Sequence, residues 1–219
     1  MKDAVRLLKA GKYTEALAAL LVLDVEAALY PELSYYLALC YTHLEKYDEA
    51  VLYLEQVVMS DLDFAHVYQS RMILGFIYAV TARYRLAEFE FTRLLEDGYE
   101  SPKVYAALAY AMHAQQKVAP AIANLEKALR LDPDNANALN SLGYILADND
   151  IRVQQAVELC SRALKRKPTN PAYLDSMGWA LFKAGRRSDA KRFLQRAAEI
   201  APENEEIERH ARAVGRVAV

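Results

Sequence analysis

The chain repeats one helical pattern about every 34 residues, and this period limits the possible folds more than any other feature. Six alanines mark the repeats, and successive ones are 34, 37, 34, 35 and 34 positions apart. They are Ala16, Ala50, Ala87, Ala121, Ala156 and Ala190. Each is followed four and seven positions later by apolar residues, a spacing that forms one face of an α-helix. The period therefore predicts stacked copies of one small helical unit.

A second small residue in each of the last five units indicates a second helix. It stands 12 or 13 positions before the marker alanine, as Ala38, Gly75, Ala109, Gly143 and Gly178. Helix starts are predicted where an N-cap residue precedes a proline, at Ser101–Pro102 and Asn170–Pro171. Helix ends are predicted before Pro133, Pro168 and Pro202. Each unit is therefore predicted to be a helix, a short turn and a second helix packed closely on the first.

The motif residues of these units resemble the tetratricopeptide repeat. Segment 34–58 carries Leu37, Ala38, Tyr41, Tyr47, Ala50, Leu54 and Val57. Segment 68–94 carries Leu74, Gly75, Tyr78, Tyr84, Ala87, Phe91 and Leu94, and segment 174–202 carries Met177, Gly178, Leu181, Gly185, Ala190, Leu194, Ala197 and Pro202. The first three units depart from the motif by lacking its terminal proline, and about three residues are inserted near 60–65.

The resemblance implies an all-α fold, a right-handed superhelical α-solenoid. We expect a single domain over residues 1–219, with repeats at about 1–28, 31–64, 68–101, 102–135, 136–169 and 171–203. Residues 204–217 are predicted to form a polar capping helix, with a narrow apolar stripe of Ile207, Ala211 and Val214. Two charge pairs are expected on its surface, Glu205 with Arg209 and Glu208 with Arg212.

Composition and residue inventory argue against an enzyme. The four histidines and two cysteines form no pair at metal-ligand or catalytic spacing, and the seven glycines form no phosphate-binding loop. We therefore expect no catalytic residues, no metal and no cofactor. No apolar run reaches the length of a membrane span. The short first helix, residues 1–10, favours a chain cut from a longer protein, with membrane attachment possible only through a missing N-terminal part.

The expected binding surface comes from the resemblance, because the first helices of tetratricopeptide units line a concave groove. Carried onto this chain, the groove positions give a column of large rings: Phe76, Tyr110, Tyr144 and Trp179. The full set of candidate partner-binding residues is Tyr35, Leu39, Met72, Phe76, Tyr110, Asn137, Asn140, Tyr144, Asp175, Trp179, Phe182 and Lys183. Exposed apolar strips of this kind are typical of partner sites. The alternative is that the rings only pack between neighbouring first helices.

Charge is uneven along the chain and provides the rival interpretation. Residues 1–100 hold 9 Lys plus Arg against 16 Asp plus Glu, and residues 101–219 hold 18 against 13. The basic residues gather mainly on second helices, as Arg162, Lys165, Arg166, Lys167, Arg186, Arg187, Lys191, Arg192 and Arg196. Such a face suits a nucleic-acid-associated or regulatory protein, but the net charge of −2 argues against nucleic acid as the main partner.

The leading functional hypothesis is a non-enzymatic scaffold that binds a peptide segment or a helix of another protein in the groove. Asn137 and Asn140 are expected to bond a bound main chain, and Asp175 or Lys183 to set its charge preference. The family's carboxylate clamp is excluded, because Tyr35, Leu39 and Met72 occupy its polar positions. Segments 142–148 and 171–179 are similar to repeats of bacterial envelope adaptors, some of which recruit proteases or assembly complexes.

Overall fold

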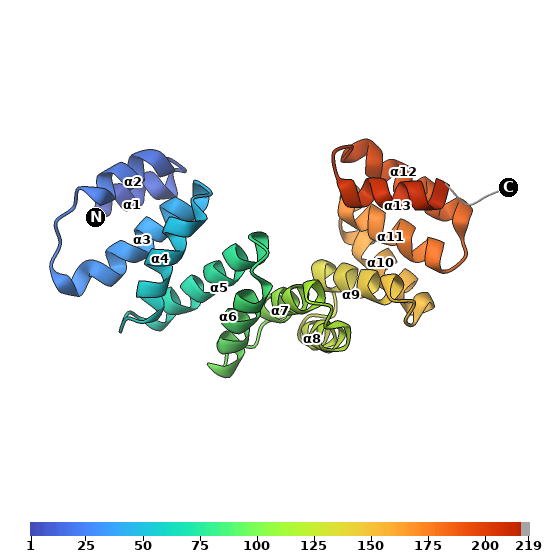
Figure 1. Cartoon of the computed structure of the whole chain (residues 1–219), viewed down its shortest axis with the longest axis horizontal. Coiled ribbons are helices and arrows are strands. Elements are labelled where there is room, and N and C mark those ends of the chain that lie inside the picture. Colours follow the sequence, from blue (N-terminus) through green and yellow to red (C-terminus); the bar gives the residue numbers. More distant parts are fainter. Residues whose placement is uncertain (216–219) are drawn as a thin grey trace. The chain divides into compact units, whose positions relative to one another are not determined.

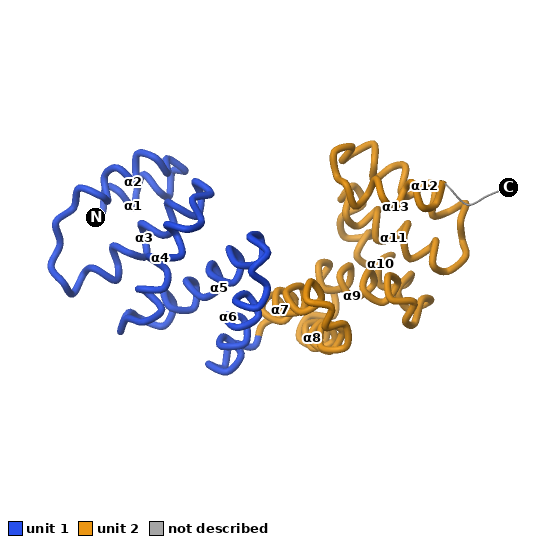
Figure 2. Tube along the Cα trace, viewed as in Figure 1, with its two compact units in different colours: residues 1–100 blue, residues 101–219 orange. Residues whose placement is uncertain are grey.

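A computed structural model describes residues 1–215 of the chain. Within them the chain forms thirteen α-helices, one short 3-10 helix and no strand (Figure 1). Six helix pairs are followed by one further helix, which confirms the predicted all-α repeat fold with a C-terminal capping helix. The helices group into two compact units, unit 1 over residues 1–100 and unit 2 over residues 101–219 (Figure 2). The expectation of a single domain stays a prediction.

The helix bounds follow the sequence repeat. Unit 1 contains α1 (Lys2–Lys9), α2 (Tyr13–Leu21), η1 (Ala27–Leu29), α3 (Tyr30–His43), α4 (Tyr47–Val58), α5 (Phe64–Val80) and α6 (Tyr84–Glu96). Unit 2 contains α7 (Pro102–Ala114), α8 (Val118–Leu131), α9 (Ala136–Asp148), α10 (Val153–Arg166), α11 (Pro171–Lys183), α12 (Arg187–Ile200) and α13 (Glu205–Gly215). Within each unit, the first helix of a pair packs on the second, and the second packs on the first helix of the next pair.

The side chains predicted as N-caps form hydrogen bonds at two helix starts in unit 2. Ser101 Oγ accepts from the backbone N–H of Val104 at 3.2 Å, and Asn170 Oδ1 accepts from that of Tyr173 at 3.1 Å. Such bonds satisfy backbone donors that have no partner within the helix. They fix where α7 and α11 begin, and therefore which of their residues share a face.

Glycines on first helices allow the two helices of a pair to approach closely. A Cβ built on Gly143 of α9 would lie 2.5 Å from Cys160 Sγ and 3.0 Å from the backbone oxygen of Ala156 on α10. A Cβ on Gly178 of α11 would lie 2.6 Å from Leu194 Cγ on α12. The shortest of these distances are well below van der Waals contact, so a larger residue fits only if neighbouring atoms of the second helix shift.

The two cysteines are buried and unpaired, as expected for small core residues. Burial raises the pKa of Cys40 to about 11 and that of Cys160 to about 12. Both thiols therefore stay protonated near neutral pH and are poor nucleophiles.

The capping helix α13 begins at a side-chain cap and lies partly in the core. Asn204 Oδ1 accepts from the backbone N–H groups of Glu206 and Ile207, both at 3.1 Å. Ile207, His210 and Val214 are buried. The prediction of a Glu208–Arg212 pair is confirmed, whereas Arg209 pairs with Glu206 at 3.2 Å and not with Glu205. Positions 216 and 217 of the predicted helix lie outside the described residues.

We predict that Gly143→Ala destabilises the chain by about 1–3 kcal/mol, because its new methyl group would meet backbone atoms of α10. Urea denaturation followed by circular dichroism measures the free energy of unfolding. Gly215→Ala is the matched control, since a Cβ there has no neighbour within 4 Å. Equal stabilities of the two variants would contradict this account of α9–α10 packing.

Candidate functional site

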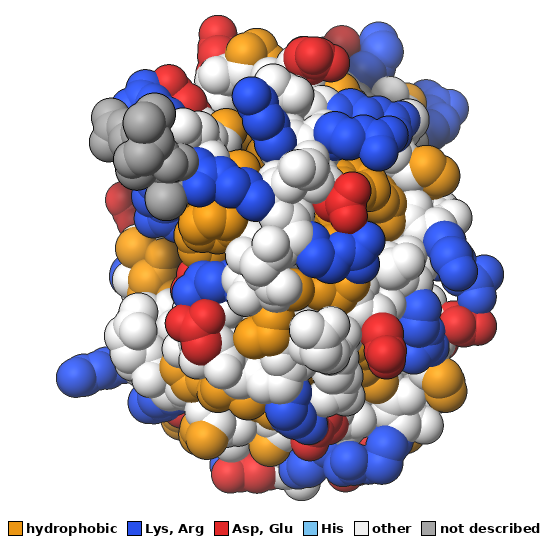
Figure 3. Space-filling view, turned by 90° about the vertical axis from the view of Figure 1, so that its right-hand side faces the viewer, with side chains coloured by type: hydrophobic (Ala, Val, Ile, Leu, Met, Phe, Trp, Pro, Cys, Tyr) orange, Lys and Arg blue, Asp and Glu red, His pale blue; other side chains and the backbone are white. Residues whose placement is uncertain are grey.

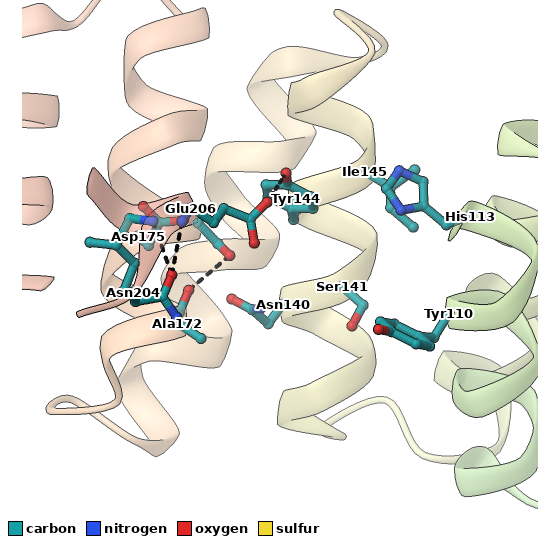
Figure 4. A pocket seen from close by; sticks show the side chains of 12 residues that line it. Tyr110, His113, Asn140, Ser141, Tyr144, Ile145, Ala172, Asp175, Asn204 and Glu206 are labelled. Atoms are coloured by element: carbon teal, nitrogen blue, oxygen red, sulfur yellow. Dashed lines mark hydrogen bonds between the residues drawn. The ribbon is translucent and has the colours of Figure 1, made fainter. Parts of the chain in front are cut away.

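A pocket of about 290 Å³ opens on the first helices of unit 2. Its walls come from α7, α9 and α11 and from the start of α13 (Figure 4). The lining residues are Tyr110, His113, Asn140, Ser141, Tyr144, Ile145, Ala172, Asp175, Ser176, Asn204, Glu206 and Ile207. We call it the unit 2 pocket.

Repeat symmetry brings equivalent residues of successive first helices to this pocket. Tyr110 of α7 and Tyr144 of α9 are 34 positions apart, and Asn140 of α9 and Asp175 of α11 are 35 apart. On α9, Asn140 and Tyr144 stand four residues apart and so share one helix face. The unit 2 pocket is therefore a direct product of the repeat, except where α13 closes it.

Polar atoms on the walls differ in how they are satisfied. Tyr144 Oη donates to Glu206 Oε1 at 2.7 Å. Burial, and then the neighbouring Glu206 carboxylate, raise the pKa of Tyr144, so this phenol keeps its proton. By contrast, Asn140 Oδ1 is buried and has no hydrogen-bond partner within the described part of the chain. A buried acceptor without a partner is unfavourable, and a bound donor would satisfy it.

Behind the pocket, α13 is attached to α11 by a buried His–Asp pair. His210 Nδ1 donates to both carboxylate oxygens of Asp175, at 3.0 and 2.9 Å. The two residues are only 1% and 4% exposed. The His210 ring also stacks on Trp179, with centroids 4.2 Å apart and an interplanar angle of 17°. Trp179 Nε1 donates to Asp148 Oδ1 at 3.0 Å.

Four of the predicted site residues meet in the unit 2 pocket: Tyr110, Asn140, Tyr144 and Asp175. The other unit 2 candidates line other surfaces. Asn137 accepts from the Tyr173 hydroxyl, and Lys183 Nζ donates to Asp150 at 2.8 Å. Phe182 packs on Trp179 with ring centroids 5.4 Å apart.

The candidates of unit 1 fall into two groups. Tyr35 is 6% exposed, and its hydroxyl donates to Gln69. Leu39 and Met72 are half-buried, whereas Phe76 is 50% exposed. The Tyr35 side chain is thus buried and the Trp179 ring stacks on His210. Phe76 and Tyr110, by contrast, are each at least half exposed to solvent.

The residues that α13 and its cap contribute to the pocket, Asn204, Glu206 and Ile207, were not predicted from the sequence. The sequence pattern indicated a capping helix, but it gave no orientation of that helix on α11. His113 and Ser141 were also missed as lining residues. His113 stands three positions after Tyr110, and Ser141 three positions before Tyr144. Because residues three positions apart are neighbours on a helix surface, this spacing was the one sequence feature that could have predicted them.

Basic side chains are spread over the face of unit 2 near the end of the described chain, with acidic and apolar ones between them (Figure 3). Several have protein partners. Arg166 pairs with Asp134 at 2.6 Å, and Arg187 donates to the backbone oxygen of Val214 at 2.5 Å. The Asp134 carboxylate offsets part of the positive charge, and the bond to Val214 holds the Arg187 side chain against the protein, so both weaken the rival interpretation of a face that binds polyanions.

The described region contains neither a group of possible metal ligands nor a candidate membrane-spanning helix. Residues 1–215 contain no group of three or more His, Cys, Asp or Glu side chains placed to hold a metal ion. None of the helices in that range is long and apolar enough to cross a membrane.

Comparison with known families matches three segments of the chain. A family model described as "TPR repeat" matches residues 109–150, and two described as "Tetratricopeptide repeat" match residues 2–63 and 151–212. The chain belongs to the tetratricopeptide repeat family. Members of this TPR family are generally non-enzymatic, and the fold supports a protein–protein interaction scaffold.

Individual relatives agree with this family. A TPR repeat-containing protein of Pseudomonas aeruginosa is 47% identical over 88 residues, which cover 38% of this chain and 15% of that protein. The match thus spans a small part of that curated relative's length.

Solved TPR structures share the fold at low sequence identity. MamA of Desulfovibrio magneticus matches with a TM-score of 0.68 and 20% identity, over 76% of this chain and 92% of that chain. YrrB, described as a TPR protein with an unusual peptide-binding site, matches with a TM-score of 0.61 and 18% identity, over 82% of this chain and 91% of that one. A TPR protein of Thermus thermophilus matches with a TM-score of 0.63 and 17% identity, over 85% of this chain and 100% of its own.

We predict that Asp175→Ala destabilises α13 by about 2–3 kcal/mol, because it leaves the buried His210 Nδ1 without an acceptor. Hydrogen exchange should show loss of protection concentrated in residues 205–215. Asp189→Ala is the control, because Asp189 pairs with Arg186 at the surface and its loss should cost less than about 1 kcal/mol. Unchanged protection of α13 in the Asp175 variant would show that this pair does not hold the helix.

Proposed function

We propose that this chain is a scaffold that binds an extended peptide segment of a partner protein across the first helices of unit 2. The observation that carries the proposal is the unit 2 pocket, which combines open ring surface at Tyr110 with the buried, unpartnered acceptor of Asn140. A peptide main chain has regularly spaced N–H donors that suit such an acceptor. The tyrosine rings supply apolar contact area.

The pocket has the size and character of a site for one anchoring side chain plus main chain. A volume of about 290 Å³ lies at the lower end of small-ligand pockets. Peptide binding in YrrB, a protein of the same fold, adds support. The remaining groove candidates, among them Asn137, Trp179, Phe182 and Lys183, would then flank the peptide outside the pocket.

We also propose that the partner belongs to the bacterial envelope, as a protease or an assembly complex that the scaffold recruits. The support is the likeness of segments 142–148 and 171–179 to repeats of envelope adaptors, together with a bacterial relative at 47% identity over 88 residues. Cross-linking in source cells, followed by mapping of the cross-linked peptides, tests this step. Cross-links confined to cytosolic proteins would refute it.

We predict that Tyr110→Ala and Asn140→Ala each weaken peptide binding by about tenfold or more, a loss typical of interface hot spots. The probe is the tightest binder selected by the full chain from a library of ten-residue peptides that are acetylated and amidated at their ends. Fluorescence anisotropy measures its affinity. Both substitutions should leave the melting temperature nearly unchanged, because Tyr110 is exposed and Asn140 only partly buried.

Leu131→Ala on α8 serves as the control for this experiment. Leu131 is 49% exposed and does not line the unit 2 pocket. Its variant removes exposed apolar surface outside the pocket and should bind the probe like the parent chain. Equal losses in all three variants, or no loss in any of them, would place peptide binding elsewhere.

A further inference from the structure

The charged side chains that line the unit 2 pocket are all of one sign. Its acidic residues are Asp175 and Glu206, and the twelve described lining residues include neither lysine nor arginine. His113 is the remaining titratable side chain of the lining besides the two tyrosines. The formal charge of the lining is therefore negative, and His113 is its one side chain that can carry a positive charge.

The two carboxylates differ in how many of their oxygen atoms already accept hydrogen bonds within the protein. Asp175 is bonded by His210 through both oxygens. Glu206 is half-exposed; it accepts from the Tyr144 hydroxyl and lies 3.2 Å from Arg209 Nη2. The Arg209 side chain is 68% exposed and does not line the pocket, so solvent screens its pairing with Glu206. Glu206 thus keeps capacity to accept from a donor that enters the pocket.

The tyrosine rings of the pocket wall and the unpartnered acceptor both favour a cationic side chain as the ligand. Tyr110 of α7 and Tyr144 of α9 both line the pocket (Figure 4), and the faces of tyrosine rings attract cations. Asn140 Oδ1 supplies a buried acceptor without a partner among residues 1–215. A cationic side chain carries several N–H donors on an apolar stem, and it matches both features.

The general charge of this half of the chain does not account for such a preference. Residues 101–219 hold 18 basic against 13 acidic residues, so the net charge of this half of the chain does not favour a cation. Selection of a cation must therefore arise from charges at the pocket itself, such as Glu206, because exposed charges more than about 10 Å away are largely screened at 0.1 M salt.

We infer that the unit 2 pocket takes up a lysine or arginine side chain of the bound peptide, with Glu206 and Asn140 as its acceptors and the two tyrosine rings as its walls. This inference rests on the proposed peptide-binding function and specifies its substrate class as a segment with a basic anchor residue. Asp175 holds α13 and thereby positions Glu206, and its own carboxylate is shared with His210.

The test is a substitution scan of the selected ten-residue library peptide, again with both ends blocked. Each position is replaced in turn by Lys, Arg, Gln, Glu and Leu, and anisotropy gives the affinity of each peptide for the full chain at 50 mM and 500 mM NaCl. We expect one anchor position at which Lys or Arg binds about tenfold more tightly than Gln at low salt, with a smaller ratio at high salt.

A double-mutant cycle then assigns this preference to the pocket. Glu206→Gln removes the charge but keeps an acceptor for the Tyr144 hydroxyl, and it should reduce the Lys-to-Gln ratio by about threefold or more. Glu205→Gln is the matched control: it makes the same charge change one residue away, on an exposed side chain that does not line the unit 2 pocket. The control should leave the ratio unchanged.

The outcomes separate the two proposals. Peptide binding that depends on Tyr110 and Asn140 but shows no basic anchor position would overturn this inference and leave the proposed function standing. The same holds if Glu205→Gln and Glu206→Gln reduce the ratio equally, because the preference would then belong to the outer surface of α13. Absence of any library binder, or binding indifferent to Tyr110 and Asn140, would overturn the proposed function and this inference together.

Discussion

The close approach of two helices at a glycine or alanine is the contact on which the rest of this structure depends. At Gly143 and Gly178 the first helix lies so near the second that a single methyl group would overlap with Cys160 or Leu194. Dispersion contacts and apolar burial stabilise such a pair only while the gap stays closed. Because each pair is fixed in this way, the opposite faces of the first helices in unit 2 are held in a constant register. That register brings Tyr110, Asn140, Tyr144 and Asp175 to one pocket.

The sequence predicted most of this arrangement, because repeat spacing and capping residues act locally. The marker alanines, the caps Ser101 and Asn170 and the helix pairs follow from residues near one another in the chain. Four unit 2 residues that the family resemblance assigns to the groove line one pocket, since repeat symmetry carries a position from one first helix to the next. Their role in binding stays a prediction.

Features that join distant parts of the chain could not be predicted in the same way. The pair of Asp175 and His210 links residues 35 positions apart, and the bond from Tyr144 to Glu206 links residues 62 apart. Both depend on the orientation of α13 on α11, which no repeat motif specifies because α13 is not a repeat unit. Local spacing therefore suggested a Glu205–Arg209 pair, whereas in the structure Arg209 pairs with Glu206, whose carboxylate also accepts from Tyr144. The position of a single helix thus explains both the incorrect charge pair and the missed pocket residues Asn204, Glu206 and Ile207.

The double role of α13 has a physical consequence for binding. Its buried face, with Ile207, His210 and Val214, covers apolar surface that would otherwise be exposed at the end of unit 2. Its first turn also supplies Glu206 and Ile207 to the pocket wall. Opening of α13 would therefore remove part of the wall at the same time as it exposes the core. Since a ligand that binds only the closed form stabilises that form by mass action, occupation of the pocket and protection of α13 are thermodynamically linked. Under the proposed function, the buried His210–Asp175 pair would contribute to peptide binding through this linkage, without itself contacting the inferred basic anchor.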